Sequence, residues 1–252
     1  MISGLKLFMI VLQVLAGFLM PLVLLFVLRR RYGCKIKAFL LGAAVMLVFA
    51  LTLEAMVHQV VLTSPAGVTI QQNIFLYALY GGFMAALFEE TGRYLAMRFL
   101  MKDMYSNDMN SVMYGAGHGG FECMVVLGIT GINNLVLALS GPPVGPTNVP
   151  GLQEDLAAQI SSYPTYMFAL GIVERISAIC LHIALSIFVW KAVTKGAAYR
   201  KYLLLAYFIH FAVDAGTVII SDYIGTVMFE ALLLVFCIAL LYYALKMLRH
   251  AY

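Results

Sequence analysis

The stretch FLYALYGGFMAALFEETGRYLAMRFLM, residues 75–101, is long enough for a membrane-spanning helix and largely apolar, yet it contains two adjacent glutamates and an arginine. A helix crosses the hydrocarbon core of a bilayer with about 20 apolar residues. Ionisable side chains inside a membrane are costly and mark functional sites. The stretch therefore predicts a transmembrane helix that places Glu89, Glu90 and Arg93 in a buried site.

The composition of the whole chain is that of an integral membrane protein. Of its 252 residues, 63% are hydrophobic and 11% are charged, and the mean hydropathy is +0.94. Soluble domains carry about 25% charged residues. We therefore expect an all-α, polytopic bundle of transmembrane helices that has the lipid bilayer as its surroundings.

Apolar runs of membrane-spanning length predict about seven helices. They are placed at 5–28, 38–62, 74–100, 110–140, 164–190, 202–220 and 223–246. The fourth is long enough to be tilted, or broken by its glycines. We expect residues 1–252 to form one membrane domain, in which a four-helix block at about 74–220 carries the chemistry.

The connections between these spans differ in charge. Lys and Arg gather at 29–37, 98–102, 191–201 and 246–249. The alternate connections at 63–73, 141–163 and 221–222 contain neither. Cytoplasmic connections collect Lys and Arg, so we expect the N-terminus outside and the C-terminus in the cytoplasm. We further expect a multi-pass protein of the cell membrane, in a bacterium. The net charge of +4 then reflects topology and gives no indication of nucleic-acid binding.

The third span offers a pairing between its charged residues. Glu89 and Arg93 are four residues apart and share a helix face, whereas Glu90 points about 100° away from Glu89. We expect Arg93 to neutralise Glu89 or to lock two helices together through it, which leaves Glu90 without a partner. The long connection at 141–163 fits either a short surface helix or an ordinary loop.

Three later spans each contain a histidine. His118 is followed four residues later by Glu122, and His210 is followed four residues later by Asp214. At a rise of about 1.5 Å per residue, these two histidines and His182 lie about 12 Å inside the predicted cytoplasmic ends of their helices. Glu89 and Glu90 lie at about the same depth. The common depth predicts one shared site, with the two later acids one turn deeper.

Glycines surround the first of these histidines. Gly115, Gly117, Gly119 and Gly120 remove side chains from the two turns around His118. Glycines in membrane helices usually permit close helix packing. They would also open space for a metal, a water molecule and a substrate backbone, and the two interpretations are compatible.

Three imidazoles with several carboxylates suit a zinc ion. Neutral histidine nitrogens and a carboxylate match the tetrahedral preference of Zn²⁺, and an open position holds a water molecule whose pKa falls toward about 7. A glutamate beside that water would take its proton and pass it to the departing amine. The pattern therefore favours metal-dependent hydrolysis.

The motifs EETGR at 89–93, YGAGHGGFE at 114–122, ERISAICLH at 174–182 and HFAVD at 210–214 resemble the YhfC family of intramembrane metalloproteases. That family belongs to a clan with the type II CAAX prenyl endopeptidases, the PrsW proteases and the secretase subunit APH-1. The resemblance extends from about residue 74 to residue 220.

The outline of the clan is matched at three places. Glu89 and Glu90 match a glutamate pair followed by a basic residue, Tyr114 and His118 match aromatic-x-x-x-His, and His210 and Asp214 match His-x-x-x-Asp/Asn. Arg93 follows the glutamate pair one residue sooner than in the prenyl endopeptidases, and Tyr114 stands where they carry phenylalanine. Glu122 and His182 lie outside the outline, so the depth argument alone places them at the metal.

The resemblance implies a metallo-endopeptidase that cleaves a membrane-embedded or membrane-adjacent polypeptide, which we expect to be reached from the inner half of the bilayer. Glu89 is then the general base and Glu90 its partner or an acid that orients the substrate. Arg93 and Arg175 keep carboxylates ionised. The expected zinc ligands are His118 and His210, with His182 as the third candidate and Asp214 and Glu122 as ligands or as carboxylates that orient the imidazoles.

Other classes fit parts of the same pattern. A metal-ion or proton-coupled transporter would also gather His, Asp and Glu near the middle of the membrane. APH-1 shows that this architecture also serves as a non-catalytic membrane scaffold. A b-type haem protein would use two of the histidines as axial ligands, although acids four residues after two of them favour a hard cation or a proton.

Overall fold

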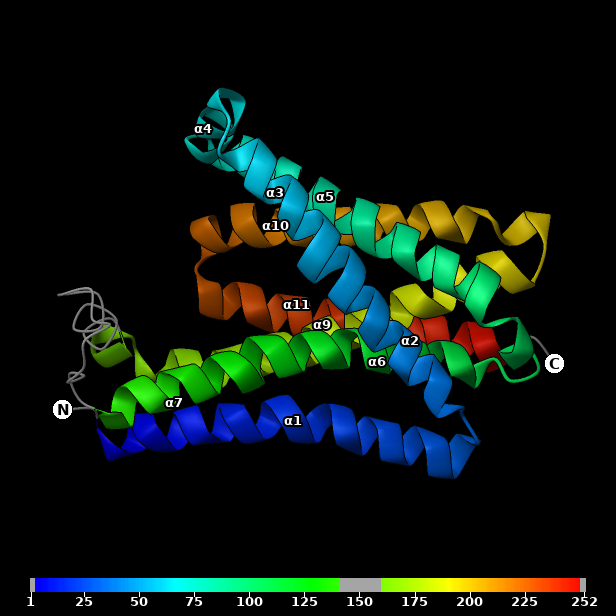
Figure 1. Cartoon of the computed structure of the whole chain (residues 1–252), viewed down its shortest axis with the longest axis horizontal. Coiled ribbons are helices and arrows are strands. Elements are labelled where there is room, and N and C mark those ends of the chain that lie inside the picture. Colours follow the sequence, from blue (N-terminus) through cyan, green and yellow to red (C-terminus); the bar gives the residue numbers. More distant parts are fainter. Residues whose placement is uncertain (1–2, 141–159, 250–252) are drawn as a thin grey trace.

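The computed structural model describes residues 3–140 and 160–249, which form a bundle of helices with no strand among them (Figure 1). The helical segments are α1 (Gly4–Tyr32), α2 (Ile36–Val45), η1 (Met46–Glu54), α3 (Ala55–Leu62), α4 (Pro65–Gln71), α5 (Ile74–Leu95), η2 (Ala96–Leu100), η3 (Lys102–Met104), α6 (Met109–Cys123), η4 (Met124–Ile129), α7 (Thr130–Ser140), α9 (Thr165–Thr194), η5 (Ala197–Tyr199), α10 (Lys201–Ile224) and α11 (Thr226–Arg249). The predicted all-α fold is confirmed. The long connection that fits a surface helix or a loop lies almost wholly outside the described residues.

Six of the described helical segments are long and apolar enough to cross a membrane. They are Gly4–Tyr32, Ile36–Leu62, Met109–Leu139, Thr165–Thr194, Ala197–Ile224 and Thr226–Leu248. The helix formed by α5 and η2 together is similar in length to these six segments, but its charged side chains make it less apolar. It packs along α10 within the bundle (Figure 1). All seven predicted spans coincide with helical segments to within a few residues. The crossing of α5 and the orientation of the chain stay predictions.

The fourth predicted span is one continuous helix from α6 through the π-helical η4 to α7, so it is not broken at its glycines. Those glycines bring other helices against the α6 backbone. A Cβ atom added at Gly117 would lie 2.0 Å from the carbonyl oxygen of Phe39 on α2, and one added at Gly115 would lie 2.5 Å from Cα of Ile183 on α9. The interpretation as close helix packing is therefore correct.

We expect Gly117→Ala to destabilise the protein by about 1–3 kcal/mol, the range for overpacking a tight interior. The added methyl group meets backbone, which has no rotamer to change. Gly81→Ala on α5 is the matched control, because a Cβ there meets nothing within 4 Å. Thermal unfolding in detergent compares the two variants. Equal midpoints would show that the α2–α6 contact does not limit stability.

Basic connections meet at one end of the bundle, here called the basic end. Lys35 and Lys37 both contact Asp103, at 3.3 and 3.0 Å. The hydrogen bond from Lys37 lowers the pKa of Asp103. At the same end, Asp108 accepts a hydrogen bond of 2.8 Å from Nε1 of Trp190 and pairs with the lysine that follows α9. These contacts join the connections before α2, α6 and α10.

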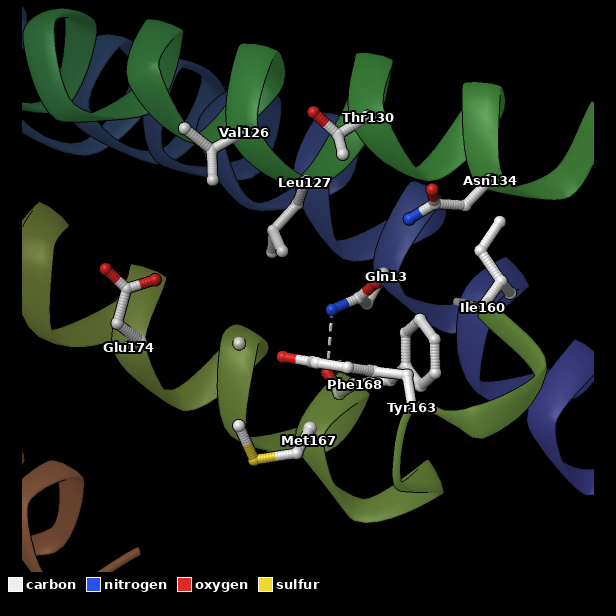
Figure 2. A pocket seen from close by; sticks show the side chains of 11 residues that line it. Gln13, Val126, Leu127, Thr130, Asn134, Ile160, Tyr163, Met167, Phe168 and Glu174 are labelled. Atoms are coloured by element: carbon white, nitrogen blue, oxygen red, sulfur yellow. Dashed lines mark hydrogen bonds between the residues drawn. The ribbon is translucent and has the colours of Figure 1, made fainter. Parts of the chain in front are cut away.

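The opposite end of the bundle holds the starts of α1 and α9. Gln13 on α1 donates from Nε2 to the carbonyl oxygen of Phe168 on α9, at 2.9 Å (Figure 2). Nearer the start of α1, Lys6 donates to the carbonyl oxygen of Ile160, at 3.1 Å. Polar contacts therefore join α1 to α9 and to the segment just before it at this end.

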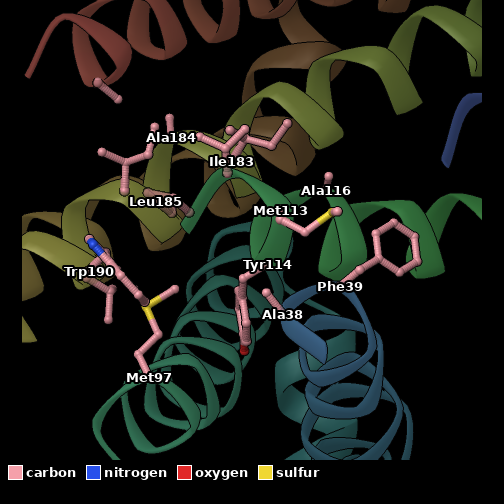
Figure 3. Close-up of a cluster of buried hydrophobic side chains, with 14 of the residues drawn as sticks. Ala38, Phe39, Met97, Met113, Tyr114, Ala116, Ile183, Ala184, Leu185 and Trp190 are labelled. Atoms are coloured by element: carbon pink, nitrogen blue, oxygen red, sulfur yellow. The ribbon is translucent and has the colours of Figure 1, made fainter. Parts of the chain in front are cut away.

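The packed core occupies the half of the bundle toward the basic end. Every residue of α9 from Leu181 to Lys191 is buried. Met97, Tyr114 and Trp190, which come from three different helical segments, are each fully buried in one cluster (Figure 3). The candidate site lies on the other side of this core.

Candidate metal centre

The side chains singled out from the sequence come together from four helices. Glu89, Glu90 and Arg93 lie on α5, His118 and Glu122 on α6, Arg175 and His182 on α9, and His210 and Asp214 on α10. Helices that run roughly along one direction place residues of equal rise at equal depth. Because of this geometry, the three histidines gather in one layer of the bundle with Glu89, Glu90 and Arg93. Glu122 and Asp214 lie one turn, and Arg175 two turns, farther along their helices from the histidines.

Glu89 occupies the centre of this layer. Its Oε2 accepts a hydrogen bond from Nε2 of His118 at 2.7 Å, and it lies 3.9 Å from Nδ1 of His182 and 3.8 Å from Nε2 of His210. One ligand atom from each of Glu89, His182 and His210 lies within 4.8 Å of the others. Atoms bound to one Zn²⁺ at about 2.0 Å lie about 3.3 Å apart. The ligand atoms of this group are therefore slightly farther apart than those around a bound zinc ion.

The imidazole of His182 lies between those of His118 and His210 and packs against both. The ring centroids of His118 and His182 are 4.8 Å apart, and those of His182 and His210 are 5.4 Å apart. All three rings are buried. The expectation that three helices converge their histidines on one point therefore agrees with the geometry, although His118 stands outside the group of three that includes Glu89.

The expected pairing of Arg93 with Glu89 is wrong. The guanidinium of Arg93 forms its ion pair with Glu90, three residues before it, and both side chains are fully buried. Positions three and four residues apart are both neighbours on a helix, so the surroundings of α5 select the partner. Glu90 also lies 2.7 Å from Nδ1 of His210, and so it has two partners.

His182 is held between two charged groups. Arg93 donates from Nη2 to Nδ1 of His182 at 3.0 Å, so Nδ1 is an acceptor and the proton lies on Nε2. That nitrogen donates to Oε2 of Glu122, also at 3.0 Å. A cation bound at Nδ1 would take the position of the guanidinium proton.

The side chain of Glu122, which lies on α6, makes its contacts with residues of α9. It bonds to His182 and accepts a hydrogen bond of 2.6 Å from Nη1 of Arg175, which also pairs with Glu174. The i,i+4 spacing from His118 placed both residues on one face, but the contacts of Glu122 reach across to α9. By contrast, the spacing of His210 and Asp214 does bring them together, at 3.4 Å.

Sequence reasoning gave no role to Glu174 or to the hydroxyl of Tyr114. Glu174 extends the ion-pair chain of His182, Glu122 and Arg175 toward the end of the bundle opposite the basic end. In the sequence, only its position next to Arg175 could have indicated that Glu174 takes part in the site. Tyr114 is fully buried and its hydroxyl has no partner among the described residues, and one sequence does not display burial.

Four buried polar atoms beside the site have no hydrogen-bond partner among the described residues: Oε2 of Glu90, Nε of Arg93, Oη of Tyr114 and Nδ1 of His118. Buried polar atoms almost always have a partner. Imidazole nitrogens and carboxylate oxygens are also the donor set that Zn²⁺ prefers. The residues therefore fit a bound divalent cation with associated water.

Fold and site define the protein as a membrane-embedded helical bundle with a buried cluster of histidines and carboxylates. The chain belongs to the YhfC family, because the model of the family described as "YhfC intramembrane metalloprotease" matches residues 16–237. A curated relative, the uncharacterized membrane protein YhfC of Bacillus subtilis (strain 168), is 37% identical over 203 residues, which are 76% of this chain and 75% of the relative. No solved structure matches the chain.

Proposed function

We propose that the protein is a zinc-dependent intramembrane peptidase that hydrolyses a peptide bond of a membrane-embedded or membrane-adjacent polypeptide. The observation that carries the proposal is the central carboxylate of Glu89, which lies within 4 Å of nitrogens of three buried histidines. The name of the family supports the same reaction class.

In this proposal His182 and His210 hold the metal together with His118. When bound, Zn²⁺ supplies Lewis acidity and lowers the pKa of a coordinated water toward about 7. The carboxylate of Glu89 would act as the general base, taking a proton from the attacking water and passing it to the departing amine nitrogen. Its hydrogen bond to His118 aims the carboxylate at the imidazoles.

The surrounding charges hold these groups in place. Arg93 neutralises Glu90, whose Oε1 fixes the ring of His210 through Nδ1 and leaves Nε2 facing Glu89. Glu122 fixes His182 through Nε2. Carboxylates that bond the second ring nitrogen orient metal-ligating histidines in this way.

The size of the site is consistent with a metal and water. The cavity next to Glu89, His182 and His210 measures about 80 Å³. Water occupies about 30 Å³ per molecule in the liquid, so the cavity holds an ion with a few waters. This volume is much smaller than a porphyrin, which supports a single ion over a b-type haem.

The proposal is tested with purified protein reconstituted into liposomes together with synthetic transmembrane peptides. We expect about one equivalent of zinc by elemental analysis, and peptide fragments by mass spectrometry that disappear on chelation. Zinc flux across the liposome membrane with every peptide intact would instead support a transporter. Protein without bound metal, flux or cleavage would support a scaffold.

A further inference from the structure

Polar side chains of the site differ in exposure along the bundle. The side chains of Glu90 and Arg93 are 0% exposed, whereas those of Glu122, Glu174 and Asp214 are 19%, 30% and 34% exposed. The three exposed carboxylates lie one or two turns farther from the basic end than the histidines of the same helices. Exposure of the site therefore increases toward the end that holds the starts of α1 and α9.

A second cavity lies at that end, between α1, α7 and α9 (Figure 2). It measures about 330 Å³ and is here called the end pocket; its polar lining residues are Gln13, Thr130, Asn134, Tyr163 and Glu174, and Gly171 leaves part of its wall without a side chain. Glu174 also lines the cavity of the metal centre. One carboxylate therefore forms a wall common to both spaces.

Among the described residues, the walls of the metal cavity toward the basic end and toward α11 are closed or apolar. Toward the basic end, α9 is buried on all sides from Leu181 to Lys191, and Met97 and Tyr114 seal the core beside it. A groove of about 520 Å³ between α10 and α11 adjoins the metal cavity at Val213 and Leu233, but its lining is entirely apolar. Apolar cavities stay dry, so that groove does not conduct water.

We propose that the end pocket is the aqueous access route to the metal centre, through which water and hydrated divalent cations pass Glu174 and Arg175. The proposal deepens the proposed function, because each hydrolysed peptide bond consumes one water molecule, whose hydroxyl joins the acyl carbon and whose proton joins the amine. Arg175 pairs with Glu122 and Glu174 and lines the metal cavity, so in this proposal its side chain is the barrier between the two spaces. Carboxylates on both sides of it favour the approach of cations over anions.

Two serines on α9 provide a matched test. Ser177 and Ser186 are both fully buried, and each donates to the carbonyl oxygen four residues earlier, at 3.1 and 2.6 Å. Of the two, only Ser177 lines the metal cavity, whereas Ser186 lies on the core side of His182. Replacement of either by cysteine changes one atom in the same local geometry.

The experiment measures labelling of single cysteines by a membrane-impermeant methanethiosulfonate ammonium reagent in right-side-out and inside-out vesicles. The background has the native Cys34, Cys123, Cys180 and Cys237 replaced by alanine. We expect Thr130→Cys in the end pocket to react rapidly, from one side only. Ser177→Cys should react from that same side, at least about tenfold faster than Ser186→Cys, because thiol reactivity follows access to water.

A blocked pocket completes the test. Gly171→Leu should fill the end pocket and slow labelling of Ser177→Cys about tenfold, whereas Gly81→Leu, where an added Cβ meets nothing within 4 Å, should leave it unchanged. An added Cβ at Gly171 lies 2.9 Å from Nε2 of Gln13, so Asn134→Trp is the second blocking variant if the first fails to fold.

Labelling of Ser177→Cys from the opposite side, or at the rate of Ser186→Cys, would overturn the proposal, and so would labelling that neither blocking variant slows. The measurement requires neither zinc nor substrate. Correct labelling in a protein that cleaves nothing would therefore reject the peptidase and keep the access route. Cleavage together with labelling from the wrong side would keep the peptidase and reject the access route.

Discussion

Replacing Glu89 with glutamine is expected to reduce peptide-bond hydrolysis about a thousandfold while the bound zinc stays near one equivalent. General base catalysis contributes about 10²–10⁴ to rates, and glutamine keeps the shape of the side chain and an oxygen donor but does not accept the proton. Turnover of a transmembrane peptide and elemental analysis of the same preparation measure both quantities.

The control is Glu230→Gln on α11, which also changes a buried glutamate but lies outside the candidate site. It should retain both hydrolysis and zinc. Hydrolysis retained by Glu89→Gln would reject Glu89 as the base. Loss of zinc together with hydrolysis would instead assign Glu89 to the metal, in line with the close group it forms with His182 and His210.

His182→Ala and His210→Ala are each expected to weaken zinc binding at least about a hundredfold, since even residues that only orient metal ligands cost 10–100-fold when removed. Each substitution deletes one of the two imidazoles in the close group. Zinc content after dialysis and titration of the metal-free protein are the measurements.

His58→Ala is the matched control, because His58 bonds to Glu54 and Tyr80 at 3.0 and 2.9 Å, outside the candidate site. It should bind zinc like the unaltered protein. If His182→Ala and His210→Ala also did so, the metal centre would be rejected. His118→Ala belongs in the same series: a loss equal to that of His210→Ala makes it a ligand, and a smaller one limits it to orienting Glu89.

The position of the helices and the depth of the site could be predicted from the sequence because both depend on one length scale. Membrane thickness sets the length of each apolar run, and a constant rise per residue places His118, His182 and His210 at one level. Neither inference requires knowledge of which helices are neighbours.

Partners across the site could not be predicted in the same way. Arg93 has a glutamate both three and four residues before it on one helix. Because histidines surround Glu89, the guanidinium of Arg93 pairs with Glu90 instead. Glu122 likewise bonds to His182 on another helix. Cavities such as the end pocket arise between helices, so no single run of sequence displays them.

The guanidinium of Arg93 has a consequence for the protein without zinc. It supplies a permanent positive charge inside the cluster, bonded to Glu90 and to the ring nitrogen of His182. Zinc fingers unfold when stripped of metal because metal binding supplies most of their folding free energy. Here the guanidinium of Arg93 balances the buried carboxylate charge without metal. Chelators should therefore remove zinc and activity reversibly, while the helices stay folded and able to bind zinc again.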